Sequence, residues 1–238
     1  MPDAPTVAQI AASLADALDA ERYTREGDPA GVWLDSPRPV RRLGMRLEAG
    51  RAPYGWAKGL DAVVLHRPFG LWPARFPDGV GALAYHRALD ERLSVGHNPA
   101  LAAALGLDAE DEPLKRGGKT VGLVGRLPAP LPAESVVDRV AGELGGVEAV
   151  VGQAEGAVDR VALVGAMTED LVTAAADRGV GVYVTGQVRR PGVAAAEARG
   201  VRVLAVGQGR AEAWGLRHLG LLVAERWPAV EIVHLDDA

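Results

Sequence analysis

The sequence predicts an α/β protein with two subdomains, and three observations lead to this prediction. The chain has 238 residues, of which 48% are hydrophobic, enough to bury one large core or two modest ones. From residue 120 onward, short apolar runs alternate with helical patterns, as in α/β layer structures. Residues 108–119 are charged and rich in glycine, which is typical of a linker. We therefore expect subdomains over 1–118 and 119–238, with the functional site between them.

The first subdomain is expected to begin with an amphipathic helix. Apolar side chains fall at helical spacing up to residue 18, and Thr6 with Gln9 forms a capping-box pattern. Later, four consecutive apolar residues over 62–65 predict a strand buried on both faces, ending near Pro68 because proline has no amide hydrogen. The further elements expected in this half are strands over 32–34 and 42–47 and a helix over 98–105.

The second subdomain shows regular alternation of the two element types. The expected strands are 121–124, 147–151, 161–164, 180–185, 201–206 and 230–235. The expected helices are 132–144, 168–176, 193–198 and 212–227.

Composition excludes several classes of protein. The net charge is −5 and the basic residues are scattered, which disfavours dedicated nucleic-acid binding. No apolar run approaches the roughly 18–20 residues of a membrane span, and residues 1–13 lack the pattern of a secretory signal. The absence of cysteine excludes disulfides and thiolate metal sites. We expect a cytoplasmic protein without membrane contact.

The strand over 62–65 delivers His66 and Arg67 at its carboxyl end, where open α/β sheets bind ligands. The alternative is that His66 is a hydrogen-bonded histidine of a loop. A second candidate is His86 with Asp90, whose spacing places both on one face of a helix. Imidazole and carboxylate together suit Zn, Fe or Mn, although this spacing is common in sequences without a metal. Residues 83–93, which contain both, fit a strand or a helix.

Two glycine-containing turns follow strands in the second half. In the first turn, over 186–191, Arg189 and Arg190 can bind phosphate or carboxylate as bidentate donors, or remain solvated charges. The second turn, over 207–212, half-fits a dinucleotide-binding fingerprint. There Glu212 replaces the third glycine and would oppose a pyrophosphate, so we favour a simple strand-to-helix turn.

Taken in order, these stretches resemble the NIF-three-like family, whose members are dinuclear-metal-centre hexameric proteins often labelled GTP cyclohydrolase type 2 homologues. Residues 61–70 are similar to the family's strand followed by His-His-Pro, and residues 85–107 to its His-x-x-Leu-Asp stretch and the helix after it. Residues 203–215 resemble its strand followed by Gly-His-x-x-x-Glu. The resemblance implies the NIF-three-like fold, two α/β subdomains with mixed sheets flanked by helices.

The departures from the family pattern fall on the metal site. His66, His86, Asp90 and Glu212 match ligand positions and could hold one metal. Arg67 and Gln208 stand where the family has histidines, and Arg189 and Arg190 occupy the loop where it has another. Arginine does not deprotonate and cannot ligate a metal. One hypothesis is therefore that Arg67 replaces the lost cation and pairs with Asp90 or Glu212.

The sequence leaves two functions open. In the first, the chain has lost dinuclear metal binding, holds no cofactor, and acts as a scaffold or a binder of a small anionic ligand. In the second, it is a metal-dependent hydrolase of cyclohydrolase or phosphoesterase type, with one Zn, Fe or Mn ion at His66, His86, Asp90 and Glu212. The resemblance also implies a homo-oligomer, a ring of six chains.

Overall fold

The computed structural model describes residues 4–154 and 156–235, which form two compact units. The first unit comprises the described residues up to Leu89 together with those from Gly215 onward, and the second comprises Asp90–Trp214. This division differs from the expected one at 118/119. The chain returns to the first unit at its far end, because the strand Glu231–His234 pairs with the strand Arg42–Glu48.

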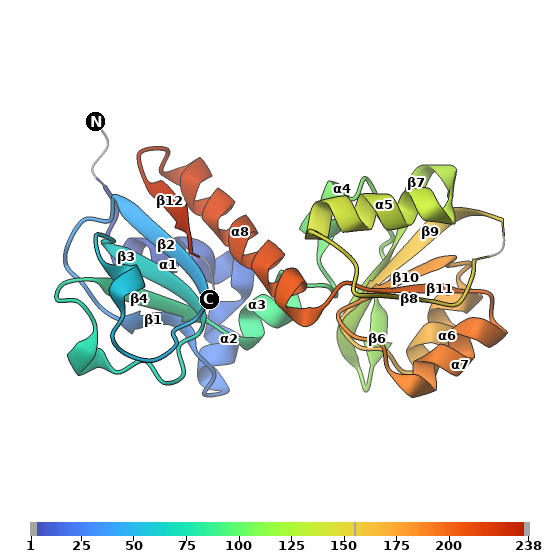
Figure 1. The fold of residues 1–238 in the computed structure, drawn as a ribbon, viewed down its shortest axis with the longest axis horizontal. Coiled ribbons are helices and arrows are strands. Elements are labelled where there is room, and N and C mark those ends of the chain that lie inside the picture. Colours follow the sequence, from blue (N-terminus) through green and yellow to red (C-terminus); the bar gives the residue numbers. More distant parts are fainter. Residues whose placement is uncertain (1–3, 155, 236–238) are drawn as a thin grey trace. The chain divides into compact units, whose positions relative to one another are not determined.

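A mixed five-stranded sheet forms the first unit (Figure 1). Its order is β1-β4-β3-β2-β12, with β1 antiparallel to β4 and the other neighbours parallel. The strands are β1 Ala30–Leu34, β2 Arg42–Glu48, β3 Ala62–Arg67, β4 Gly81–Tyr85 and β12 Glu231–His234. The helices are α1 Val7–Leu18, α2 Ala20–Arg25, α3 Arg87–Arg92 and α8 Gln208–Arg226, with short 3-10 turns at Gly55–Ala57 and Pro73–Arg75. Helices α3 and α8 each cross the boundary between the units.

The two faces of the first sheet carry different layers. Met45 of β2 and Ile232 of β12 lie against Gly220 of α8, so the face that carries Met45 is covered by helix. On the opposite face, Val63 and Leu65 of β3 join an apolar cluster with residues of the long connections between strands, such as Tyr54. Helix α1 begins with the predicted capping box, because Thr6 Oγ1 accepts from the Gln9 amide and Gln9 Oε1 accepts from the Thr6 amide.

A seven-stranded sheet forms the second unit. Its order is β5-β7-β9-β10-β11-β8, with β6 paired to β7, and β9, β10 and β11 run parallel. The strands are β5 Asp108–Ala109, β6 Leu114–Arg116, β7 Lys119–Pro132, β8 Ala149–Val151, β9 Ala157–Val164, β10 Val182–Thr185 and β11 Arg202–Ala205. The helices are α4 Pro99–Ala104, α5 Ala133–Leu144, α6 Glu169–Asp177 and α7 Arg190–Ala198.

Helices cover both faces of the second sheet. Figure 1 shows α4 and α5 on one face and α6 and α7 on the other. Two apolar clusters fill these layers, one containing Val136 of α5 and Val184 of β10, the other Leu171 of α6 and Tyr183 of β10. Adjacent strand residues therefore contribute to opposite layers, as alternation along a strand requires. The predicted α/β class with two mixed sheets flanked by helices is confirmed.

Several predicted elements differ in detail. Residues 108–119 contain β5 and β6, so they are edge pieces of the second sheet and not a linker. The ambiguous segment 83–93 holds the end of β4 and then α3. Helix α8 begins at Gln208, four residues before the expected start at 212. In the described part of the chain, no helix has the length and apolarity that a bilayer span requires.

Candidate metal centre and adjacent cavities

His66 is positioned by β3, which lies between β2 and β4 in the first sheet. The predicted apolar run of this strand is fully buried, and the His66 side chain at its end is also 0% exposed. Alternation places His66 on the same face as Val64. Because Val64 is registered with Met45, that face is the one covered by helix. His66 is thus a buried imidazole of a strand, on the face covered by helix, which differs from the loop histidine of the alternative prediction.

Arg67 points to the opposite face of the same strand. Consecutive strand residues alternate, and Arg67 follows Val63 and Leu65 on the side of the Tyr54 cluster. Its Nη1 lies 2.5 Å from Oε1 of Glu48, its register partner on β2. The hypothesis from the sequence pairs Arg67 with Asp90 or Glu212, as a substitute for a cation beside His66. That pairing stays a prediction, and the ion pair with Glu48 is the Arg67 contact that the structure describes.

His86 is held by a carboxylate that the sequence did not reveal. It follows β4 directly, and its Nδ1 lies 2.9 Å from Oδ1 of Asp28. The other oxygen of Asp28 accepts the amide of Arg87, the first residue of α3, at 2.9 Å. A histidine whose Nδ1–H donates to a carboxylate keeps the lone pair on Nε2, which is the usual arrangement behind a metal-bound imidazole.

His66, His86 and Asp90 converge. One potential ligand atom of each lies within 4.8 Å of those of the other two, and the two imidazole rings have centroids 5.4 Å apart. The i, i+4 spacing of His86 and Asp90 brings them together, because α3 starts immediately after His86. Two imidazoles and one carboxylate are a donor set that suits a single divalent transition metal such as Zn, Fe or Mn.

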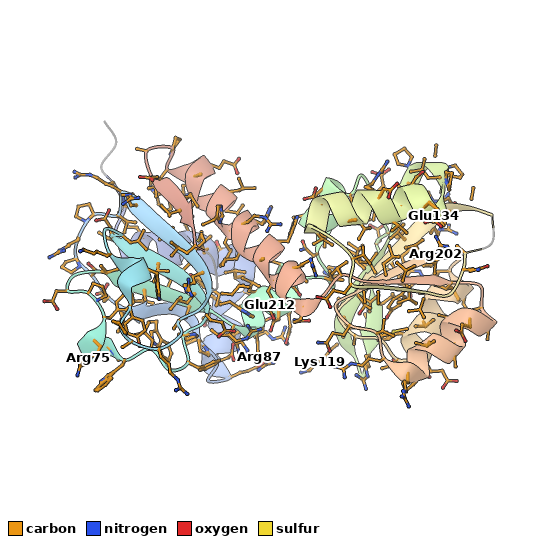
Figure 2. The ribbon with its side chains drawn as sticks, viewed as in Figure 1. Arg75, Arg87, Lys119, Glu134, Arg202 and Glu212 are labelled. Atoms are coloured by element: carbon orange, nitrogen blue, oxygen red, sulfur yellow. The ribbon has the colours of Figure 1, made fainter. Side chains whose placement is uncertain are left out.

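Glu212 and Gln208 lie one turn apart on α8, in the second unit. Glu212, labelled in Figure 2, is only 2% exposed, and Oε1 of Glu212 accepts from Nε2 of Gln208 at 3.0 Å. Within the described residues, the convergent group comprises the two histidines and Asp90 without Glu212. Gln208 therefore acts as an amide donor to Glu212, at a position where the resemblance implies a histidine ligand.

Arg189 lines a cavity of about 430 Å³ in the second unit, at the carboxyl ends of β9 and β10. Arg190, the other predicted anion-binding residue, is exposed and not among the lining residues. A neighbouring cavity of about 260 Å³ is lined by Asp90, Gln208 and Lys119, the last also labelled in Figure 2. Both cavities lie wholly within Asp90–Trp214 and share Gln208.

The turn over 207–212, which half-fits a dinucleotide fingerprint, is a strand-to-helix connection. Gly207 has φ +89° and precedes the first residue of α8. With Glu212 buried on that helix, the turn carries a carboxylate where the fingerprint needs its third glycine.

Comparison with known proteins identifies a family that matches nearly the whole chain and a relative that matches about half of it. The model of the Duf34/NIF3 (NGG1p interacting factor 3) family matches residues 5–237. A protein from Allochromatium vinosum, described as a GTP cyclohydrolase 1 type 2 homolog, is 29% identical over 147 residues, or 54% of this chain. That match covers 56% of the relative's own length.

Solved structures agree over nearly the full chain. Protein ybgI, of unknown function, has a TM-score of 0.74 at 20% identity and covers 98% of this chain and 99% of its own. TTHA1606 from Thermus thermophilus has a TM-score of 0.68 at 23% identity with the same coverage, 98% and 99%. A Bacillus cereus protein related to NIF3 has a TM-score of 0.67 at 17% identity and covers 98% and 97%. At these identities the likeness establishes the fold alone.

Proposed function

The chain belongs to the Duf34/NIF3 family, and from this membership and the His66–His86–Asp90 cluster we propose that it is a metal-dependent hydrolase with one divalent transition metal. The single observation that carries the proposal is the convergence of these three side chains. Three protein ligands with a remaining open position are typical of catalytic metal sites, whereas structural sites are closed by four.

Each residue has a distinct part in the proposed site. His66 supplies an imidazole whose orientation is fixed by burial within the sheet layer. His86 supplies a second imidazole, oriented by Asp28, and Asp90 supplies negative charge that offsets part of the charge of a dication. A divalent metal bound there would supply the Lewis-acid chemistry that hydrolases use to activate water and polarise a substrate.

The metal-free scaffold is supported by one specific observation, the hydrogen bond between Gln208 and Glu212. A glutamine amide is a poor ligand for Zn or Fe. A carboxylate that accepts from that amide has a partner without any metal. This alternative predicts a purified protein without stoichiometric metal, and a function limited to binding another protein or an anion.

Elemental analysis of the purified chain distinguishes the metal-dependent hydrolase from the metal-free scaffold. We expect one equivalent of Zn, Fe or Mn per chain, restored by titration after chelation. His66→Ala and His86→Ala should lose it, while His234→Gln, which alters an exposed histidine of β12, should retain it. A chain that binds no metal even in titration contradicts the proposal, and so does equal metal content in all variants. Two equivalents would indicate a dinuclear centre. Hydrolysis of GTP and of phosphoesters is then assayed on the loaded protein.

We also propose that the chain forms a homo-oligomer, for which the resemblance implies six copies, and that it works in the cytoplasm. An apolar groove in the first unit supports self-association. It is lined by Val32, Trp33 and Phe69, which are 44%, 41% and 53% exposed. Val32 and Trp33 belong to β1, which is an edge strand of its sheet and offers backbone groups to another chain.

A further inference from the structure

The 430 Å³ cavity of the second unit is lined largely by polar and charged side chains. Its walls come from the carboxyl ends of three parallel strands and the segments after them: Gly165–Thr168 after β9, Thr185 at the end of β10 with Gln187 and Arg189 after it, and Gln208 after β11. This is the edge at which open α/β sheets bind ligands, and its volume lies in the range of about 300–1,000 Å³ found for small-molecule sites. The remaining charged wall is Arg116, at the end of β6.

The charged side chains that line this cavity are all positive. Arg116 and Arg189 contribute two guanidinium groups, and no carboxylate belongs to the lining residues. Arg189 Nη2 donates to Oε1 of Gln187 at 2.9 Å, which directs the guanidinium without neutralising it. Helix α7 begins at this wall with no acidic residue in its first turn, so its positive end adds to the potential. The acidic residues that start α6, Glu169 and Asp170, are exposed and not part of the lining.

Thr185 supplies an independent observation. It is the last residue of β10, is 0% exposed, and lines the cavity. Its hydroxyl oxygen has no hydrogen-bond partner within the described part of the chain. A buried hydroxyl without a partner destabilises the fold, so its retention needs a reason beyond folding. Nearby, burial raises the pKa of Tyr183, whose phenol donates to the Ala166 carbonyl at 2.6 Å and fixes the loop after β9.

We propose that this cavity binds the oxyanion of a small phosphate-bearing molecule through Arg116, Arg189 and the hydroxyl of Thr185. Two fixed positive charges match a phosphate monoester, which carries nearly two negative charges at neutral pH, better than a carboxylate, which carries one. The hydroxyl donates a further hydrogen bond to the same group. Arg190, although adjacent to Arg189, lies outside the lining and takes no part.

The neighbouring 260 Å³ cavity could hold the remaining part of the phosphate-bearing molecule. The two cavities share Gly165, Ala166 and Gln208, and the second is lined by Asp90. A molecule anchored by its phosphate at Arg189 would reach with its remaining part toward Asp90. This extension rests on the proposed metal-dependent hydrolysis, whereas the phosphate site itself does not.

Calorimetric titration with inorganic phosphate, at constant ionic strength set with chloride, tests the site. We expect saturable binding of one equivalent per chain. Arg189→Gln and Arg116→Gln should each weaken binding about tenfold or more, as expected for loss of a hydrogen bond to a charged group. Two matched controls remove the same charge beside the cavity: Arg190→Gln and Lys115→Gln should bind as the unaltered chain does. Acetate in place of phosphate should bind more weakly.

Thr185→Val separates binding from folding. It replaces a hydroxyl by a methyl group of similar size, so we expect weaker phosphate binding together with an equal or higher melting temperature. His86→Ala distinguishes this site from the metal centre, because it should leave phosphate binding unchanged even if it abolishes metal binding. The proposal is overturned if phosphate does not saturate, if acetate binds as tightly, if either control loses affinity as its matched variant does, or if binding is lost with His86→Ala and kept with Arg189→Gln.

Discussion

Asp28 and His86, 58 residues apart in the sequence, are joined by a 2.9 Å contact between Oδ1 and Nδ1. Antiparallel pairing of β1 with β4, in which Ala30 faces Tyr85, brings them together. The second oxygen of Asp28 accepts the Arg87 amide, so one carboxylate fixes both the imidazole and the start of the helix that carries Asp90.

Asp28→Asn should therefore weaken metal binding without removing any ligand. The amide is uncharged and pairs less strongly with the imidazole, so His86 becomes less basic and less well oriented. Loss of such a supporting carboxylate typically costs about 10–100-fold in metal affinity. Competition with a chelator of known affinity measures the change. Glu26→Gln is the matched control, because Glu26 binds Arg87 at 2.8 Å in the same region. Equal affinity of Asp28→Asn and the unaltered chain would argue against a metal at His86.

The apolar groove at β1 leads to a prediction about the oligomeric state. Trp33→Glu places a charge on a tryptophan that is 41% exposed. If that groove is covered by another copy, burial of an unpaired charge should dissociate the oligomer, and sedimentation velocity should record a smaller species. Leu221→Glu changes a side chain of α8 that is 66% exposed and should leave the assembly intact. An unchanged sedimentation coefficient in Trp33→Glu would place the interface elsewhere.

Glu110 should make stability depend on pH. Arg178 Nη2 and Arg160 Nε contact its two oxygens at 2.7 and 2.9 Å, and hydrogen bonding to Arg178 is the main cause that lowers the pKa of Glu110 below 4.5. The Glu110 carboxylate thus binds a proton more tightly in the unfolded chain than in the folded chain. The stabilisation is complete above pH 4.5 and is lost as the pH falls through the lowered folded pKa.

Glu110→Gln should accordingly lower the free energy of unfolding at pH 7 by about 1–2 kcal/mol, a value reduced for partial exposure. The difference from the unaltered chain should narrow in acid, as the pH falls through the lowered pKa of Glu110. Thermal unfolding at both pH values measures it. Glu112→Gln, at an exposed neighbour, is the control and should have little effect. A difference that persists in acid would show that the effect does not come from the charge.

Gly207 should tolerate no side chain. It adopts φ +89°, and a Cβ there would meet the carboxylate of Glu148, which itself pairs with Arg210 at 2.9 Å. Gly207→Ala should lower the melting temperature, with a cost of about 1–3 kcal/mol for the left-handed backbone. Gly209→Ala is the contrasting change, because its Cβ would meet nothing within 4 Å and alanine favours the helix. Similar shifts in both variants would contradict this account.

Local patterns in the sequence predicted those parts of the fold that local physics decides. The capping box at Thr6 and the buried run before His66 both depend on neighbouring residues, and both are confirmed. The convergence of His86 and Asp90 also follows from helical spacing.

Features that depend on distant pairing were missed. Asp28 lies in a loop with no sequence signal that relates it to His86, since only the register of β1 on β4 joins them. The ion pair of Arg67 with Glu48 was also not predicted, because it depends on the register of β3 on β2. Thr185 gave no signal, since an orphaned hydroxyl is visible only once the surrounding chain is placed.

The return of β12 to the first sheet has a consequence for biosynthesis. Glu231 pairs with Arg42, which lies 189 positions earlier in the chain, whereas every strand of the second unit finds its neighbours within Asp90–Trp214. On the ribosome the second unit can thus acquire its native contacts while the first sheet still lacks its edge strand. The β2 edge of the first sheet stays unpaired until residues beyond 230 have emerged. During that interval Arg42–Glu48 is an exposed edge strand to which chaperones can bind.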